Sequence, residues 1–150
     1  MAGFKKNGHT PHTLVINADN GPENSGVRSQ WLKRLVEFSA QREITIRLAY
    51  YPPYHSKYNL IERVFGVLEN YWNGDPLRTP EKALGMAEGM TYKGVHPTVA
   101  LVQKSYAKGI KLGNQQRRLY ELAMYRLKNL EKWFIKIDPR RAQTVCLLAE

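Results

Sequence analysis

Two acidic residues, Asp19 and Glu62, stand at positions where carboxylates can hold a metal ion. Asp19 directly follows the apolar run TLVINA (13–18), and Glu62 lies at the start of a predicted helix after a second apolar run, ITIRLAYY (44–51). In open α/β sheets ligands bind at the carboxyl ends of the strands, so both carboxylates are expected at one sheet edge. Their oxygens suit Mg²⁺ or Mn²⁺. The alternative is a plain turn at Asp19 and a surface ion pair of Glu62, for example with Arg63.

Several other metal and nucleotide motifs do not match the sequence. The stretch DNGPENSG is not an EF-hand loop, because its sixth residue is Asn24 and no glutamate follows at the twelfth position. The four histidines lack the spacing of zinc ligands, and neither GxxxxGK[ST] nor GxGxxG occurs. The pair of carboxylates therefore remains the strongest indication of chemistry.

The order of predicted elements determines where these acids lie. Helical spacing of apolar residues predicts helices over 27–41 and 60–72, which follow strands at 13–18 and 44–51. A strand–helix–strand unit of this kind usually forms a parallel pair with a right-handed crossover. Two strands are too little sheet for a stable fold. Either the tail supplies further strands, or the sheet lacks its beginning.

The second half of the chain is predicted to be mainly helical. Thr79 and Pro80 predict the start of a helix that runs to about residue 92, and a short helix is expected over 98–106. A long helix is predicted over 115–133. Its seam consists of Leu119, Leu122, Leu127 and Leu130. In the tail, DPRR indicates a turn, and TVCLLA indicates a strand or a packed extension.

The composition favours one folded domain and makes a polyanion a candidate partner. The chain has 150 residues, 43% of them hydrophobic, which is enough for a core without disulfides. Its 23 Lys and Arg residues against 13 Asp and Glu give a net charge of +10. This charge indicates binding of nucleic acid and a merely solvated basic surface about equally. The single Cys146 and the lack of a signal or membrane-spanning run favour the cytoplasm.

Around the two acids, the sequence resembles DDE-type insertion-sequence transposases, relatives of the RNase H and retroviral-integrase fold. The matching stretches are LVINADNGPENSGVRSQWLKRLVEFS and IRLAYYPPYHSKYNLIERVFGVLENYWNG, and PPYHSKYNLIER is the most specific block. MTYKGVHP and LEKWFIKI extend the resemblance to about residues 13–138. It implies transposition by phosphodiester hydrolysis and DNA strand transfer, with transposon ends and target DNA as partners.

The resemblance also implies roles for individual residues. Asp19 matches the second aspartate and Glu62 the third acid of a set that holds two divalent cations, Mg²⁺ or Mn²⁺. Residues just before Glu62 are expected to contact nucleic acid, with plain solvent exposure as the alternative: His55, Lys57, Tyr58 and Asn59. Base stacking and loop packing are the two alternatives for the tyrosines of this region: Tyr50, Tyr51, Tyr54 and Tyr58.

One departure from the family concerns its first aspartate, which belongs on an earlier strand, whereas no acidic residue precedes Asp19 here. The expected fold is therefore α/β and RNase H-like but truncated, lacking the first strands: a parallel strand–helix–strand–helix unit followed by helices. Residues 1–12 are expected to form a flexible lead-in, 13–110 a partial catalytic core and 111–150 a helical carboxyl-terminal extension. An open edge of the first strand would recruit a second copy or the missing upstream segment. The chain alone would have little activity.

Two other functions stay open at this point. A non-catalytic remnant would bind nucleic acid through charge alone and would need no metal. A helical interaction domain would instead use the leucine seam of the long predicted helix to bind a protein partner or a second copy.

Overall fold

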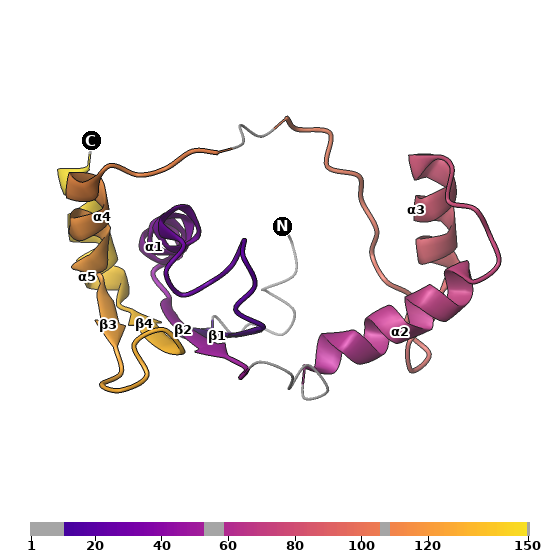
Figure 1. The fold of residues 1–150 in the computed structure, drawn as a ribbon, viewed down its shortest axis with the longest axis horizontal. Coiled ribbons are helices and arrows are strands. Elements are labelled where there is room, and N and C mark those ends of the chain that lie inside the picture. Colours follow the sequence, from indigo (N-terminus) through magenta and orange to yellow (C-terminus); the bar gives the residue numbers. More distant parts are fainter. Residues whose placement is uncertain (1–10, 53–58, 106–108, 150) are drawn as a thin grey trace. The chain divides into compact units, whose positions relative to one another are not determined.

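The computed structural model describes residues 11–52, 59–105 and 109–149, which belong to two compact units. The first unit joins residues 1–53 to residues 109–150, so it combines the two ends of the chain (Figure 1). The second unit is the intervening segment, 54–108. Within the described ranges, no helix is both long and apolar enough to cross a membrane.

The first unit contains a four-stranded mixed sheet. Its strands are β1 (Thr13–Ala18), β2 (Thr45–Tyr50), β3 (Met124–Arg126) and β4 (Phe134–Ile137), in the spatial order β1-β2-β4-β3. β1 and β2 are parallel, and β4 runs antiparallel to both β2 and β3. The predicted parallel strand–helix–strand unit is thus confirmed, and β1 lies at one edge of the sheet.

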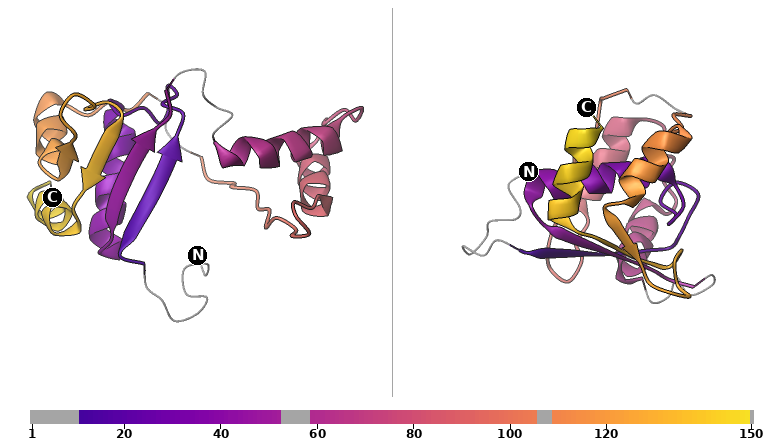
Figure 2. Two further views of the ribbon diagram at one scale, coloured as in Figure 1. Left: turned by 90° about the horizontal axis from the view of Figure 1, so that it is seen from below. Right: turned by 90° about the vertical axis from the view of Figure 1, so that its left-hand side faces the viewer.

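Three helices cover one face of this sheet: α1 (Ser29–Arg42), α4 (Asn114–Glu121) and α5 (Pro139–Leu148), as Figure 2 shows. Alternate strand residues point to that face and form the core with the helices. The fully buried strand residues are Ile46, Leu48, Ile135 and Ile137. The intervening residues belong to the opposite face, where Val15 is 57% exposed. Among the described residues of this unit, helices therefore pack on one face of the sheet only.

The prediction of one long helix over 115–133 is wrong. The helix α4 ends at Glu121, and the chain then forms β3, a turn with Asn129 in the left-handed region, and β4. Pairing β4 with β2 buries Ile135 and Ile137 completely, which outweighs the helix propensity of the leucines. Most of the expected seam is left exposed as a result: Leu122, Leu127 and Leu130.

Residues 111–150 are consequently not a helical extension, because they supply two of the four strands of the sheet. The tail contains a helix rather than a strand: Asp138 caps α5 by accepting hydrogen bonds from the backbone N–H groups of Arg140 and Arg141, and Pro139 stands at its first position. α5 packs on α1 through the buried Ala142 and Val145. The edge of β1 is not covered by this tail.

The second unit contains two helices, α2 (Leu60–Trp72) and α3 (Pro80–Gly89). The bounds of α2 agree with the sequence prediction. The side chain of Thr79 caps α3 by accepting from the N–H of Lys82, as its type and position predicted. α3 ends three residues before the expected end, and residues 98–105 form no helix.

Candidate metal centre and the loop after the first strand

Asp19 opens a tightly bonded loop at the carboxyl end of β1. Its Oδ1 accepts two hydrogen bonds, one from the backbone N–H of Gly21 at 3.2 Å and one from Nδ2 of Asn24 at 3.0 Å. Asn20 adopts a left-handed conformation, with φ 61°, and its Oδ1 accepts from the N–H of Gly26 at 3.1 Å. Asparagine tolerates this conformation better than most residues. The turn thus holds the carboxylate at the end of the strand.

The oxygen atoms of this loop fit a hard divalent cation. The carboxylate of Asp19 is exposed, and its Oδ2 accepts no hydrogen bond from another described residue. The Oδ1 of Asn24 is buried beside it without a hydrogen-bond partner in the described part of the chain. An unpaired buried acceptor is costly unless a ligand or water satisfies it. Carboxylate and amide oxygens are the donors that Mg²⁺ and Mn²⁺ use.

The hydrogen bonds also keep Asp19 ionised. The bond from Asn24, followed by that from the N–H of Gly21, lowers the pKa of Asp19 below its ordinary value. A group with a lowered pKa favours the folded loop at pH values above the ordinary aspartate pKa. This contribution is lost as the pH falls through the lowered pKa. A deprotonated carboxylate is the form that binds metal, so protons compete less with the cation.

Replacing Asn24 with Ala is expected to raise the pKa of Asp19 towards its ordinary value, because the largest cause of the lowering is removed. The carboxyl ¹³C shift of Asp19, followed by NMR from pH 2 to 7, measures this change. Asn17→Ala is the matched control, since Asn17 is exposed at the end of β1, the strand that leads to Asp19. An unchanged Asp19 titration in Asn24→Ala would contradict the assignment of this bond.

Two aromatic residues, Tyr50 and Trp31, support the loop through hydrogen bonds. The hydroxyl of Tyr50 donates to the backbone oxygen of Asn24 at 2.6 Å and accepts from Nε1 of Trp31 at 3.2 Å. Burial raises the pKa of Tyr50, so its hydroxyl stays protonated and able to donate. Stacking of Tyr50 on bases is thereby excluded, because its side chain is buried in the core. The alternative of packing is correct for this residue.

Glu62 lies in the first turn of α2, where a negative charge interacts favourably with the helix dipole. Its side chain is exposed and forms no ion pair with any described residue. Asn59 is the N-cap, but its side chain makes no capping hydrogen bond. A Cβ placed on Gly66 would meet nothing within 4 Å in the described structure. Among the described residues, nothing obstructs the surface of α2 at Gly66.

Asp19 and Glu62 belong to different units, so their approach to one cation stays a prediction. The described ranges contain no group of three or more His, Cys, Asp or Glu side chains that could hold a metal together. The predicted nucleic-acid contacts His55, Lys57 and Tyr58 lie outside the described residues, as does Tyr54. Asn59 is the one member of the predicted set that the structure places.

Comparison with known proteins identifies the family of the chain. The family described as Rhodopirellula transposase DDE domain matches residues 5–139, which includes both units and both acids. The chain belongs to this family. No curated protein and no solved structure matches it. Membership confirms the expected DDE-type insertion-sequence transposase domain, and it associates the chain with DNA transposition and with divalent metal ions.

The transposase domain also carries a basic row that sequence reasoning did not single out. On the open face of the sheet, Arg47 of β2 pairs with Lys136 of β4, and Lys136 pairs with Tyr125 of β3. Lys136 Nζ and the guanidinium of Arg141 lie 5.8 Å and 4.3 Å from the centre of the Tyr125 ring. Like charges that face each other across strands are unfavourable. No acidic side chain pairs with these three cations in the described ranges.

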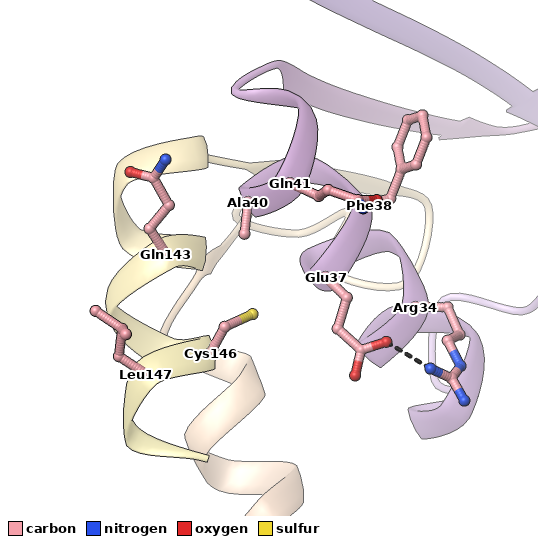
Figure 3. A pocket seen from close by; sticks show the side chains of 8 residues that line it. All are labelled: Arg34, Glu37, Phe38, Ala40, Gln41, Gln143, Cys146 and Leu147. Atoms are coloured by element: carbon pink, nitrogen blue, oxygen red, sulfur yellow. Dashed lines mark hydrogen bonds and ion pairs between the residues drawn. The ribbon is translucent and has the colours of Figure 1, made fainter. Parts of the chain in front are cut away.

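A groove between α1 and α5 differs from this row in its chemistry (Figure 3). Its cavity of about 840 Å³ is lined mainly by the hydrophobic or hydrocarbon parts of residues such as Phe38, Ala40 and Leu147. Its single carboxylate, Glu37, is bound by Arg34 at 2.7 Å and by Lys33 at 3.6 Å. With its only carboxylate already paired, the groove does not offer the ligands of a metal site.

Proposed function

We propose that this transposase domain adopts an RNase H-like arrangement and that Asp19 and Glu62 hold catalytic Mg²⁺ or Mn²⁺ together. The observation that supports this best is Asp19 itself: an exposed, ionised carboxylate, fixed directly after a parallel strand and beside an unpaired amide oxygen. Glu62 supplies the second carboxylate from an open helix surface. We expect their carboxyl carbons to lie roughly 4–8 Å apart, given metal–oxygen distances of about 2.0–2.6 Å.

Each residue of the loop has a definable part in this site. Asp19 contributes a negative oxygen ligand, and Asn24 both orients that ligand by donating to Oδ1 and offers its own oxygen. Tyr50 fixes the backbone of Asn24. When bound, divalent cations activate a water or a DNA 3′-hydroxyl and stabilise the leaving oxygen of the phosphodiester.

Asp19 and Glu62 are the two acids that we propose for this site, and no acidic residue precedes Asp19 in the sequence. Two carboxylates hold two cations poorly, and a misplaced metal lowers the rate by orders of magnitude. Incubation of the chain with supercoiled plasmid and Mn²⁺ is expected to give little nicking. Nicking that disappears in Asp19→Asn would show that these two acids suffice.

We propose that the basic row formed by Arg47 and Lys136 of the sheet and Arg141 of α5 contacts DNA phosphates. Arg47 and Lys136 face each other across the strands, and Arg141 of α5 lies beside the same Tyr125 ring as Lys136. None of the three has an acidic partner among the described residues, which matches a polyanion in charge. The segment next to Glu62 would add further contacts through His55, Lys57, Tyr58 and Asn59. Backbone contacts of this type position DNA but carry little sequence specificity.

DNA binding is therefore expected to weaken as salt rises, because phosphate contacts release counterions. In the double variant Arg47→Gln/Lys136→Gln, the slope of log K against log salt should fall by about 2, one for each lost contact. Fluorescence anisotropy with a labelled duplex measures both slopes. The control Lys111→Gln/Arg117→Gln removes the same charge from exposed positions elsewhere. Equal slopes in the two double variants would refute a contact at the basic row, and binding that is independent of salt would refute electrostatic binding altogether.

A further inference from the structure

The side chain of Arg126 bonds to two residues close to it in the sequence and to one that is 100 residues away. Its Nε and Nη2 donate to the two carboxylate oxygens of Glu121 at 2.9 and 2.7 Å. Its Nη1 donates to the backbone oxygens of Gly26 and Glu131, both at 2.8 Å. Arg126 belongs to β3, Glu121 ends α4, and Glu131 lies in the turn before β4. Gly26 belongs to the Asp19 loop, 100 residues away from Arg126.

Gly26 is the point where that loop is fixed to the carboxyl-terminal hairpin. Gly26 is buried, and a Cβ added to it would lie 2.3 Å from the backbone oxygen of Lys132. Its oxygen accepts from Arg126, while its N–H donates to the side chain of Asn20. Asn20 directly follows Asp19. A continuous set of contacts thus runs from Glu121 through Arg126, Gly26 and Asn20 to the carboxylate.

We propose that Arg126 is a positioning residue for Asp19, and that Glu121 orients it for this task. The Glu121 carboxylate holds the guanidinium in a planar two-bond pair and leaves Nη1 to bind Gly26. Loops tied down only by water or by their own residues sample many conformations. The Arg126 contact instead fixes the far end of the Asp19 loop to the folded sheet. The part of this inference that concerns a metal rests on the proposed function of Asp19, whereas the contact itself does not.

Lysine cannot replace Arg126 in this position. A planar guanidinium presents several donors in a fixed fork, whereas an ammonium is a compact charge without that geometry. Arg126→Lys therefore keeps the charge but loses the simultaneous bonds to Glu121, Gly26 and Glu131. Arg118→Lys is the matched control, since Arg118 is exposed on the adjacent helix α4. Glu121→Gln removes the charge that orients the fork and serves as a second variant if Arg126→Lys fails to fold.

The test compares local and global opening in the full chain by amide hydrogen exchange. In Arg126→Lys and in Glu121→Gln, the N–H groups of Gly21 and Gly26 are expected to exchange at least about tenfold faster relative to those of Leu48 and Ile135 in the central strands. The ratio should stay unchanged in Arg118→Lys. A purely structural role would raise all four exchange rates by the same factor, and this result, or an unchanged loop, would overturn the proposal.

A second measurement separates this inference from the proposed function. Titration with MnCl₂ alone, followed by electron paramagnetic resonance, is expected to show binding about tenfold weaker in Arg126→Lys than in the parent chain, because residues that orient a metal ligand typically change affinity by about 10–100-fold. Unchanged Mn²⁺ affinity together with faster loop exchange would overturn positioning of a ligand. If the parent chain itself binds no Mn²⁺ through Asp19, the proposed function fails, and the exchange ratio still decides whether Arg126 fixes the loop.

Discussion

Replacing Asp19 with Asn is expected to lower the rate of DNA cleavage by about a thousandfold or more in any form of this transposase that cleaves DNA. The substitution preserves the size of the side chain but removes the charge that holds a cation. Metal stabilisation of the transition state contributes several kcal/mol, and each 1.36 kcal/mol corresponds to about a factor of ten in rate. Single-turnover cleavage of a labelled transposon end, at saturating Mg²⁺ or Mn²⁺, measures the effect.

Asp75→Asn is the matched control for this prediction. Asp75 is about half exposed and forms a surface ion pair with Lys82 in the second unit. Such pairs contribute little to stability, so cleavage should remain within about twofold of the parent rate. Glu62→Gln should resemble Asp19→Asn, whereas Glu69→Gln, on an exposed part of the same helix, should not. A rate for Asp19→Asn within tenfold of the parent would remove Asp19 from the metal site.

Replacing Ile135 with Ala is expected to lower the free energy of unfolding by about 2–5 kcal/mol, the usual cost of truncating a fully buried aliphatic side chain. Ile135 lies in β4, opposite Leu48 of β2, and both side chains are completely buried. The large expected effect follows from the carboxyl-terminal hairpin being part of the main core. Urea unfolding followed by tryptophan fluorescence and circular dichroism measures it.

The control for this second prediction is Ile110→Ala, which makes the same change at a residue that is 52% exposed. Exposed substitutions usually stay within about 0.5 kcal/mol. A loss below about 1 kcal/mol in Ile135→Ala would mean that β4 does not belong to the core of the first unit, and that residues 111–150 form a separate extension after all.

The amino-terminal half of the fold could be predicted because its signals are local. TLVINA is a short apolar run that ends at turn residues, and it forms β1 with the predicted bounds. Apolar spacing likewise predicted α2 from Leu60 to Trp72. Pro80 and Thr79 marked the start of α3 in the same way. In each case the residues that specify the element are neighbours in the chain.

The carboxyl-terminal half was predicted incorrectly because its structure depends on partners elsewhere. Leucines at near-helical spacing over 119–130 indicated one long helix, but the chain leaves that helix at Glu121 to pair β4 with β2. The alternation in FIKI (134–137), with the turn-favouring Asn129 before it, was the available signal for a hairpin. A helical interaction domain built on the leucine seam loses its basis, since that seam does not form on one helix.

The candidate site shows the same division between local and distant information. The position of Asp19 after a strand could be predicted from the sequence, because the strand and the turn residues adjoin it. The supports of its loop could not: Tyr50 reaches Asn24 across 26 residues, and Arg126 reaches Gly26 across 100. No local pattern marks an arginine that will bind a backbone oxygen at that separation. The pairing of β1 with β2 brings Tyr50 close to Asn24, and the pairing of the carboxyl-terminal hairpin with β2 brings Arg126 close to Gly26.

The shared metal site of Asp19 and Glu62 is tested most directly by Mn²⁺ added to the ¹⁵N-labelled chain. Bound Mn²⁺ broadens the NMR signals of nearby amides, so the signals around both Asp19 and Glu62 are expected to broaden at the same Mn²⁺ concentration. Asp19→Asn should abolish the broadening at both places, while Asp75→Asn should leave it unchanged. Broadening around one acid alone, or broadening near Glu62 that persists in Asp19→Asn, would contradict a cation shared by the two carboxylates.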